Sequence, residues 1–191
     1  DTLHHVLVQG LDMTQVRYLL FTHSHDDHFA PLELQYMSWM FTAETPPPIR
    51  ILAPEHIVRR AREALGIDAI PLATDTLEPW VPVRLDRWTV TPVPAFHMEN
   101  EVCFNYIVHD GQRGVLYATD TGWYADDTWE QLAGRGLNGL VVECTKGFGE
   151  GGYERHLSIS QVVAMRQRML DSRALAQDAR VVTTHHSHMA G

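Results

Sequence analysis

Cysteine is scarce in this chain, with two among its 191 residues. Cys103 and Cys144 each lie in an apolar, strand-like stretch, so we expect buried reduced thiols, and a single disulfide between them stays open as the alternative. Because 45% of the residues are hydrophobic, a chain of this length can bury a sizeable core without disulfides. The composition therefore indicates a compact domain whose stability does not depend on cross-links.

The chain also lacks an apolar run as long as a membrane span, and it does not open with a signal-peptide pattern. We therefore expect a cytoplasmic protein with no membrane partner, with the reservation that a leader could have preceded Asp1. Cationic residues are few as well, 15 Lys and Arg against 24 Asp and Glu, which gives a formal net charge of −9. Because phosphate backbones are held by clustered Lys and Arg, this balance argues against a nucleic-acid partner and favours a small anionic substrate.

Histidine, by contrast, is abundant, with twelve in the chain. Three of them fall within six residues, in an H-x-H-x-D-H pattern made by His23, His25, Asp27 and His28 directly after an apolar stretch. An expression tag would be an uninterrupted terminal run, whereas this spacing is irregular and internal. Imidazole and carboxylate ligands at this density indicate a binding site for zinc, with manganese and iron as alternatives.

The remaining pattern alternates strands and helices, which predicts one α/β domain over residues 1–191. Pro46, Pro47 and Pro48 break the chain after the first helix-like stretch, and Gly66 is the expected stop of the second helix. A turn at Asp110 and Gly111 is expected to join two antiparallel strands. The predicted strands are residues 16–21, 49–53, 88–94, 102–108, 114–118, 137–143 and 180–184. The predicted helices are residues 32–41, 55–65 with Pro54 at the first position, a helix to residue 132 capped by Asp126 or Asp127, and a helix to residue 170 capped by Ser158 or Ser160.

Further ligand candidates close three of these strands: His97, Asp120 and His185. A single aspartate at a strand end is more often a turn or cap residue than a ligand. Their recurrence in one chain, together with the histidine-rich segment, favours a shared metal site instead.

These motifs resemble those of the metallo-β-lactamase superfamily, with a T-D-T-G segment at residues 119–122 and a closing T-H at residues 184–185. The resemblance implies a four-layer αββα sandwich with two divalent metal ions. One ion would take His23, His25, His97 and Asp120, and the second would take Asp27, His28, Asp120 and His185. Members of the superfamily carry two or three strands before the first motif, so we expect this chain to be truncated at its N-terminus and to stop near the site at its C-terminus.

Two details resemble the phosphodiesterase branch of that superfamily, which includes transfer-RNA 3′-processing endonuclease Z and a phosphonate-lyase accessory phosphodiesterase. One is the R-H-L-S segment around His156, and the other is the T-H-x-S-H ending at residues 184–188. The resemblance assigns His156 as the proton donor to the leaving group. The catalytic candidates are therefore His156 and Asp27. An imidazole near a helix N-terminus can also face the anion that the helix dipole favours.

We therefore expect a dinuclear hydrolase that attacks a small or cyclic phosphodiester with a metal-bound hydroxide. A lactonase, a β-lactamase or a thioester hydrolase of the same fold is the first alternative, and a transfer-RNA processing endonuclease is the second. A metal-free scaffold domain is the non-enzymatic alternative, and a homodimer is left open. No long insertion with a basic arm is present to hold transfer RNA, which favours the small substrate.

Overall fold

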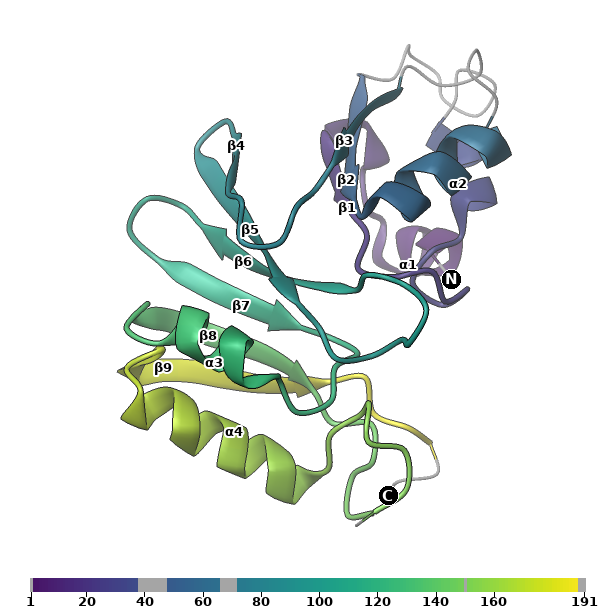
Figure 1. The fold of residues 1–191 in the computed structure, drawn as a ribbon. Coiled ribbons are helices and arrows are strands. Elements are labelled where there is room, and N and C mark those ends of the chain that lie inside the picture. Colours follow the sequence, from purple (N-terminus) through teal and green to yellow (C-terminus); the bar gives the residue numbers. More distant parts are fainter. Residues whose placement is uncertain (1, 38–47, 66–71, 150, 189–191) are drawn as a thin grey trace. The chain divides into compact units, whose positions relative to one another are not determined.

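The computed structural model describes residues 2–37, 48–65, 72–149 and 151–188 (Figure 1). The chain divides into two compact units, Asp1–Glu78 and Pro79–Gly191, called here the N-terminal unit and the C-terminal unit. The predicted helix over residues 32–41 lies outside the described residues from residue 38 on, as do Pro46, Pro47 and Gly66.

The N-terminal unit contains a three-stranded parallel sheet in the order β1-β2-β3. Its apolar core contains buried residues of β2, of α2 and of the loop before the 3₁₀ helix η2, among them Ile51, Ile57 and Phe29, and α2 contacts η2. Ile57, Val58 and Ala61 lie on one face of α2, at the spacing that a helix needs to present an apolar stripe. The elements are α1 (Thr2–Gln9), η1 (Met13–Gln15), β1 (Tyr18–Leu20), η2 (Pro31–Met37), β2 (Ile49–Ala53), α2 (Glu55–Leu65) and β3 (Leu72–Thr76).

The C-terminal unit contains a six-stranded mixed sheet in the sequential order β4-β5-β6-β7-β8-β9. The first three pairs are antiparallel and the last two are parallel. The elements are β4 (Val83–Leu85), β5 (Trp88–Pro94), β6 (Phe104–His109), β7 (Gly114–Ala118), α3 (Asp126–Leu132), β8 (Leu137–Glu143), α4 (Ile159–Asp171) and β9 (Leu175–Thr184).

This pairing gives four strands of the sheet the same direction. Since β5 and β7 are both antiparallel to β6, they run parallel to each other, and β8 and β9 continue in the direction of β7. The arrowheads of β7, β8 and β9 accordingly point to one edge in Figure 1. The loops that follow these four strands therefore meet at one edge of the sheet, which is where open α/β sheets place their ligands.

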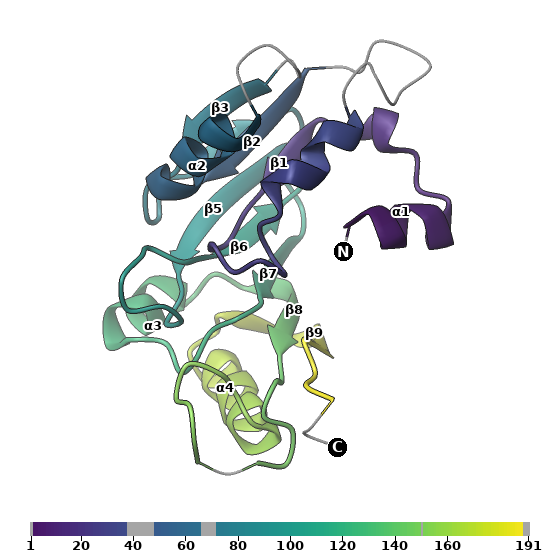
Figure 2. The ribbon, with the colours of Figure 1, turned by 90° about the vertical axis from the view of Figure 1, so that its right-hand side faces the viewer.

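The helices α3 and α4 supply the main core of this unit. Trp129 and Leu132 from α3 and Met165 and Met169 from α4 are buried against strand residues such as Leu140. In Figure 1 α4 runs alongside β9, which it contacts, and Figure 2 shows the same helix nearly end-on beside the sheet. A capping box starts α4, because the Ser158 side chain accepts from the Gln161 amide while the Gln161 side chain accepts from the Ser158 amide.

Most of the predicted elements are confirmed, four of the strands and one helix with identical bounds: β2, β5, β7, β8 and α2. The predicted antiparallel pair across Asp110 and Gly111 is β6 with β7. Ser158, one of the two residues predicted to cap α4, is its cap. Both cysteines are free and buried, as predicted for reduced thiols.

Other predictions are wrong in detail. Asp126 and Asp127 lie in the first turn of α3, and the capping position is Ala125, whose side chain has no hydrogen-bonding group. Pro54 directly precedes α2, and its carbonyl accepts the first helical hydrogen bonds, so it lies one position before the predicted one. The described part of residues 32–41 is the 3₁₀ helix η2, not an α-helix. Strand β9 begins five residues before the predicted start at residue 180, and β3, β4 and α1 were not predicted.

Within the described residues, no helix is both long and apolar enough to cross a membrane.

Candidate metal centre

The H-x-H-x-D-H segment forms a compact loop of the N-terminal unit. Phe21 and Phe29 hold its two ends in the apolar core, and their rings meet edge to face with centroids 5.0 Å apart. The Phe21 amide donates to the Leu52 carbonyl at the end of β2, and the Phe29 amide donates to the His25 carbonyl at 2.8 Å. Because both ends are anchored, the intervening side chains are held close together.

The ring nitrogens of this loop converge. His23 Nε2 lies 3.1 Å from His25 Nδ1, and the ring centroids of His23 and His28 are 4.4 Å apart. His28 Nε2 also lies 3.3 Å from an Asp27 carboxylate oxygen. One imidazole N–H can donate to the other nitrogen at 3.1 Å, and the same spacing is close to the roughly 3.3 Å between two nitrogens on a tetrahedral zinc ion. The donor set and its spacing therefore fit a zinc-type ion.

In the C-terminal unit, the polar candidates follow the four strands that end at one edge. His97 comes after β5, Asp120 after β7, Glu143 is the last residue of β8, and His185 comes after β9. Asp120 and His185 have positive φ angles of 46° and 53°, a conformation that residues other than glycine adopt rarely. Such strained positions cluster at functional sites, where the surrounding structure must hold them.

Asp120 and His185 lie together, with Asp120 Oδ1 3.1 Å from His185 Nδ1. The Thr145 hydroxyl donates to the His185 carbonyl at 2.9 Å and lies 2.8 Å from His185 Nδ1. Because its one hydrogen goes to the carbonyl, the Thr145 oxygen accepts from Nδ1, which therefore carries the ring proton. The metal-binding lone pair of His185 is then on Nε2. The same reasoning applies to His97, whose Nδ1 faces the Arg155 carbonyl at 3.3 Å.

This arrangement is the one usual for metal-binding histidines, which donate one ring N–H to a carboxylate, carbonyl or hydroxyl and bind metal through the other nitrogen. Within the C-terminal unit, Asp120, His156 and His185 offer ligand atoms that all lie within 4.8 Å of one another. The C-terminal unit thus contains three donors close enough to hold one divalent ion, and the His23 and His25 nitrogens of the N-terminal unit have the spacing of two ligands on such an ion.

Glu143 is the residue that organises the C-terminal set, and the sequence motifs do not include it. Its carboxylate is fully buried. One oxygen accepts from the Thr121 amide at 3.0 Å and from His156 Nδ1 at 2.7 Å. The other oxygen accepts from the Thr145 amide at 3.0 Å and the Leu157 amide at 3.2 Å. The carboxylate therefore ties together the loops that follow β7 and β8 and the segment that leads into α4.

His156 lies among the other candidates of this unit. Its Nδ1 is 3.8 Å from Asp120 Oδ1, and its ring centroid is 4.9 Å from that of His97 and 5.7 Å from that of His185. Because Glu143 accepts from Nδ1, the reactive nitrogen of His156 is Nε2. A carboxylate that accepts from Nδ1 fixes the orientation of the ring and leaves Nε2 to transfer a proton, as a proton donor requires. A metal ligand would also accept this geometry, so metal content in a variant must decide between the two roles.

The segment that carries His156 is fixed by a close approach of two backbones. The Gly122 amide donates to the Phe96 carbonyl at 2.7 Å. A Cβ atom at Gly122 would lie 2.1 Å from the Glu154 carbonyl oxygen and 3.0 Å from Arg155 Cα. Only glycine fits there, so the glycine of the T-D-T-G segment has a packing role that its motif did not reveal.

All the predicted candidates thus fall into two sets, one in each unit. His23, His25, Asp27 and His28 form the first, and His97, Asp120, His156 and His185 form the second. Sequence reasoning missed Glu143, Thr145 and Gly122 as site residues. A buried strand that ends in an acidic residue, as residues 137–143 do, was the available signal for Glu143.

The sequence model of the family described as the beta-lactamase superfamily domain matches residues 2–186 of this chain. No curated protein matches the chain in sequence.

Solved structures show the fold. The metallo-β-lactamase fold protein YhfI from Bacillus subtilis superposes with a TM-score of 0.73 at 18% identity, over 96% of this chain and 72% of that one. A diphosphatase of the PhnP family superposes with a TM-score of 0.71 at 19% identity, over 98% of this chain and 66% of that one. The short form of human tRNase Z superposes with a TM-score of 0.69 at 19% identity, over 98% and 79%. The predicted α/β metallo-β-lactamase fold is therefore confirmed, and the chain spans just under two thirds of the diphosphatase.

Proposed function

We propose that this chain, which belongs to the beta-lactamase superfamily, is a metal-dependent hydrolase that cleaves a small or cyclic phosphodiester. The observation that carries this proposal is the ion-pair geometry of Glu143 and His156, whose carboxylate oxygen and Nδ1 are 2.7 Å apart. Alkoxide leaving groups of phosphodiesters depart only with a proton, and a histidine held this way can supply it. The descriptions of two similar structures as a diphosphatase and a tRNase Z agree with chemistry at phosphorus.

The two donor sets would together hold two divalent ions, zinc first, with manganese and iron as alternatives. On the family resemblance, His23, His25, His97 and Asp120 would bind one ion. Asp27, His28, Asp120 and His185 would bind the other, with Asp120 shared. When bound, the ions would activate water as the nucleophile and stabilise charge on the phosphoryl oxygens.

Residues of the chain itself would transfer the protons and orient the metal-binding histidines. Glu143 holds His156 with its proton on Nδ1 and stabilises the positive charge of the protonated ring. His156 would then transfer the proton on Nε2 to the departing oxygen. Thr145 orients His185 through its ring N–H, and the Arg155 carbonyl does the same for His97. Asp27, half of the Asp27–His28 pair, is the proposed acceptor of the proton that the attacking water loses.

A panel assay with zinc, manganese or iron tests the substrate class. Bis-p-nitrophenyl phosphate and a 2′,3′-cyclic nucleotide represent phosphodiesters, and nitrocefin and a lactone represent the carbonyl substrates. We expect turnover of the phosphodiesters to exceed that of the carbonyl compounds. Faster cleavage of nitrocefin or the lactone than of either phosphodiester would refute the assignment and favour the first alternative.

The variant Asp120→Asn tests the shared ligand in the same experiment. Asparagine keeps the size of the side chain and tolerates the positive φ at this position, so the fold should survive. We expect loss of at least one ion per chain, measured by inductively coupled plasma spectrometry, together with most of the activity. Two ions per chain with unchanged turnover would contradict the sharing of Asp120.

A further inference from the structure

We propose that Tyr153 is a specificity-determining residue whose exposed ring stacks against a nucleobase of the substrate, on the leaving-group side of His156. This inference rests on the proposed function and names the substrate class for the same site. The side chain of Tyr153 is 56% exposed, although it is large and aromatic. Its ring centroid is 5.7 Å from that of His156, with the planes inclined by 53°. The ring is therefore a neighbour of the proposed proton donor.

The ring of Tyr153 is exposed but held in place. Its hydroxyl donates to the His97 carbonyl at 3.3 Å, and Arg155 Nη1 donates to the same oxygen at 3.3 Å. Arg155 Nη2 in turn pairs with Glu99 at 2.9 Å. A tyrosine fixed at its polar tip offers a rigid apolar surface, and a ligand that binds to it costs little side-chain entropy. Tyrosine is common in binding surfaces for this reason.

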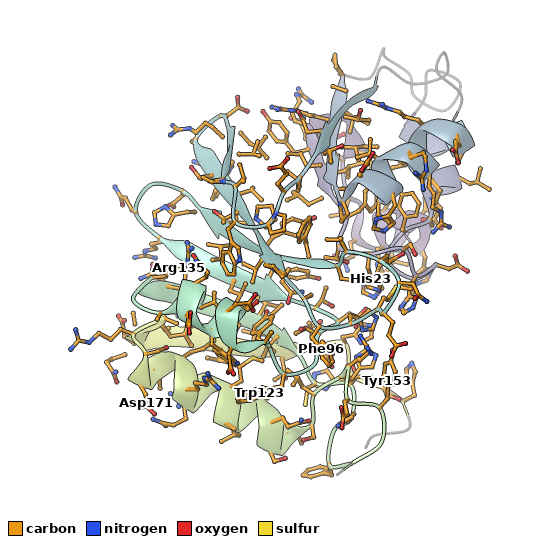
Figure 3. The ribbon with its side chains drawn as sticks, viewed as in Figure 1. His23, Phe96, Trp123, Arg135, Tyr153 and Asp171 are labelled. Atoms are coloured by element: carbon orange, nitrogen blue, oxygen red, sulfur yellow. The ribbon has the colours of Figure 1, made fainter. Side chains whose placement is uncertain are left out.

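A second planar surface lies next to it. The Arg155 guanidinium stacks over the Phe96 ring, 4.5 Å from its centroid, and Phe96 is itself 39% exposed. Figure 3 labels Phe96 and Tyr153 among the loop side chains of the C-terminal unit. The close approach at Gly122 holds the backbone of Arg155 against the loop that follows β7. Two exposed aromatic rings thus flank an arginine that is hydrogen-bonded to the backbone between them.

These features indicate which kind of chemical group can bind beside Tyr153. A leaving oxygen that receives its proton from His156 must lie within hydrogen-bonding distance of that ring, so the group attached to this oxygen extends past the same neighbours. Tyrosine faces bind planar aromatic groups by stacking, and nucleobases stack on them whatever their sequence. The negative charge of a nucleotide is on its phosphate, so the uncharged base can pack against an apolar surface. A nucleoside phosphodiester therefore fits better than an alkyl one.

A matched pair of substrates tests this inference. Adenosine 2′,3′-cyclic phosphate and the 2′,3′-cyclic phosphate of methyl riboside contain the same scissile bonds, and only the first has a base. We expect the zinc-loaded wild type to favour the nucleotide through a lower KM. Tyr153→Leu should reduce kcat/KM for the nucleotide by about ten- to hundredfold, the range for the loss of one stacked base, and leave the riboside unchanged. Tyr153→Phe keeps the ring and loses only the hydrogen bond at its tip, so it should keep more of the preference than Tyr153→Leu.

The matched control is Phe148→Leu. Phe148 is an aromatic residue of the same glycine-rich segment and is 81% exposed, but in the described structure it lacks the hydrogen bond to the His97 carbonyl that fixes Tyr153. Phe148→Leu should leave kcat/KM unchanged for both the nucleotide and the riboside. A binding measurement gives a second readout, since adenosine 2′-monophosphate should bind Tyr153→Leu more weakly in calorimetry, and ribose phosphate should not.

The outcomes separate the two proposals. Equal losses for both substrates in Tyr153→Leu, or no loss for either, would overturn the stacking role while the phosphodiesterase proposal stands. An equal KM of the wild type for both substrates would do the same. A wild type that hydrolyses bis-p-nitrophenyl phosphate but neither cyclic phosphate would overturn the role of Tyr153 alone. A wild type that hydrolyses none of the three phosphodiesters would overturn the proposed function, and the role of Tyr153 with it.

Discussion

Replacing Glu143 with glutamine tests whether one buried carboxylate organises the site of the C-terminal unit. Its two oxygens accept four hydrogen bonds, from three backbone amides and His156 Nδ1. Glutamine has the same shape but one oxygen only, so its NH₂ group must face two of these donors. The substitution therefore removes acceptors without creating a cavity.

The structure allows the cost to be worked out for each orientation of the amide. If the NH₂ group faces the Thr145 and Leu157 amides, two buried N–H groups lose their acceptor, at about 1–3 kcal/mol each. If it faces Thr121 and His156 instead, only the Thr121 amide loses its acceptor, because the histidine can give up its Nδ1 proton and accept from the NH₂ group. The second orientation is cheaper. We therefore expect a destabilisation of about 1–3 kcal/mol and a His156 ring that no longer donates from Nδ1 to a carboxylate.

Urea unfolding followed by tryptophan fluorescence measures the stability of this unit, because four of the five tryptophans lie in it. Turnover of a substrate with an alkoxide leaving group should fall in Glu143→Gln, by more than turnover of a p-nitrophenyl ester. Glu130→Gln is the control, because Glu130 is an exposed carboxylate on α3 and its change should stay within about 0.5 kcal/mol. If Glu143→Gln unfolded at the urea concentration of the wild type and cleaved both esters at wild-type rates, the organising role of the carboxylate would be refuted.

Three further predictions concern neighbouring positions. His156→Ala should keep both metal ions and slow cleavage by roughly a hundred- to ten-thousandfold for an alkoxide leaving group, and by less for p-nitrophenolate, which hardly needs a proton; loss of metal would make His156 a ligand. Gly122→Ala should destabilise the unit by about 1–3 kcal/mol or more in urea unfolding, because backbone atoms must move. Gly114→Ala, which meets only the side chains of Leu137 and His109, should cost less. Burial raises the pKa of the Cys103 thiol from 9.0 to about 11, so this thiol should react slowly with Ellman's reagent at pH 8 until the protein is unfolded. Fast reaction of Cys103 in the native protein would contradict the raised pKa. Since this pKa favours the neutral thiol in the folded state, the contribution of Cys103 to stability is complete below pH 9 and declines as the pH rises to about 11.

Local patterns in the sequence were enough to predict several elements and the candidate ligands. Strand β5 and helix α2 appear with the predicted bounds, because a short apolar run and a helical stripe are each decided by neighbours along the chain. Asp126 and Asp127 show the limit of such patterns, because aspartate is favoured equally at a cap and in the first turn of a helix. The start of β9 was missed because its first residues are mixed in polarity, with Gln177 and Asp178 exposed, and the strand is extended to Leu175 by the pairing of Leu175 with Leu137 of β8.

The sequence by itself determined the chemistry of the candidate site, because the density of His and Asp in residues 23–28 and at strand ends is a property of composition and order alone. Tertiary structure decided which residues support that chemistry. Glu143 acquires its role from Thr121, 22 residues before it, and His156, 13 residues after it. Gly122 is required by a carbonyl 32 residues away, and Tyr153 is held by a carbonyl 56 residues away. Such contacts depend on the register of the whole sheet, which brings distant loops to one edge and leaves no local periodicity from which to read them.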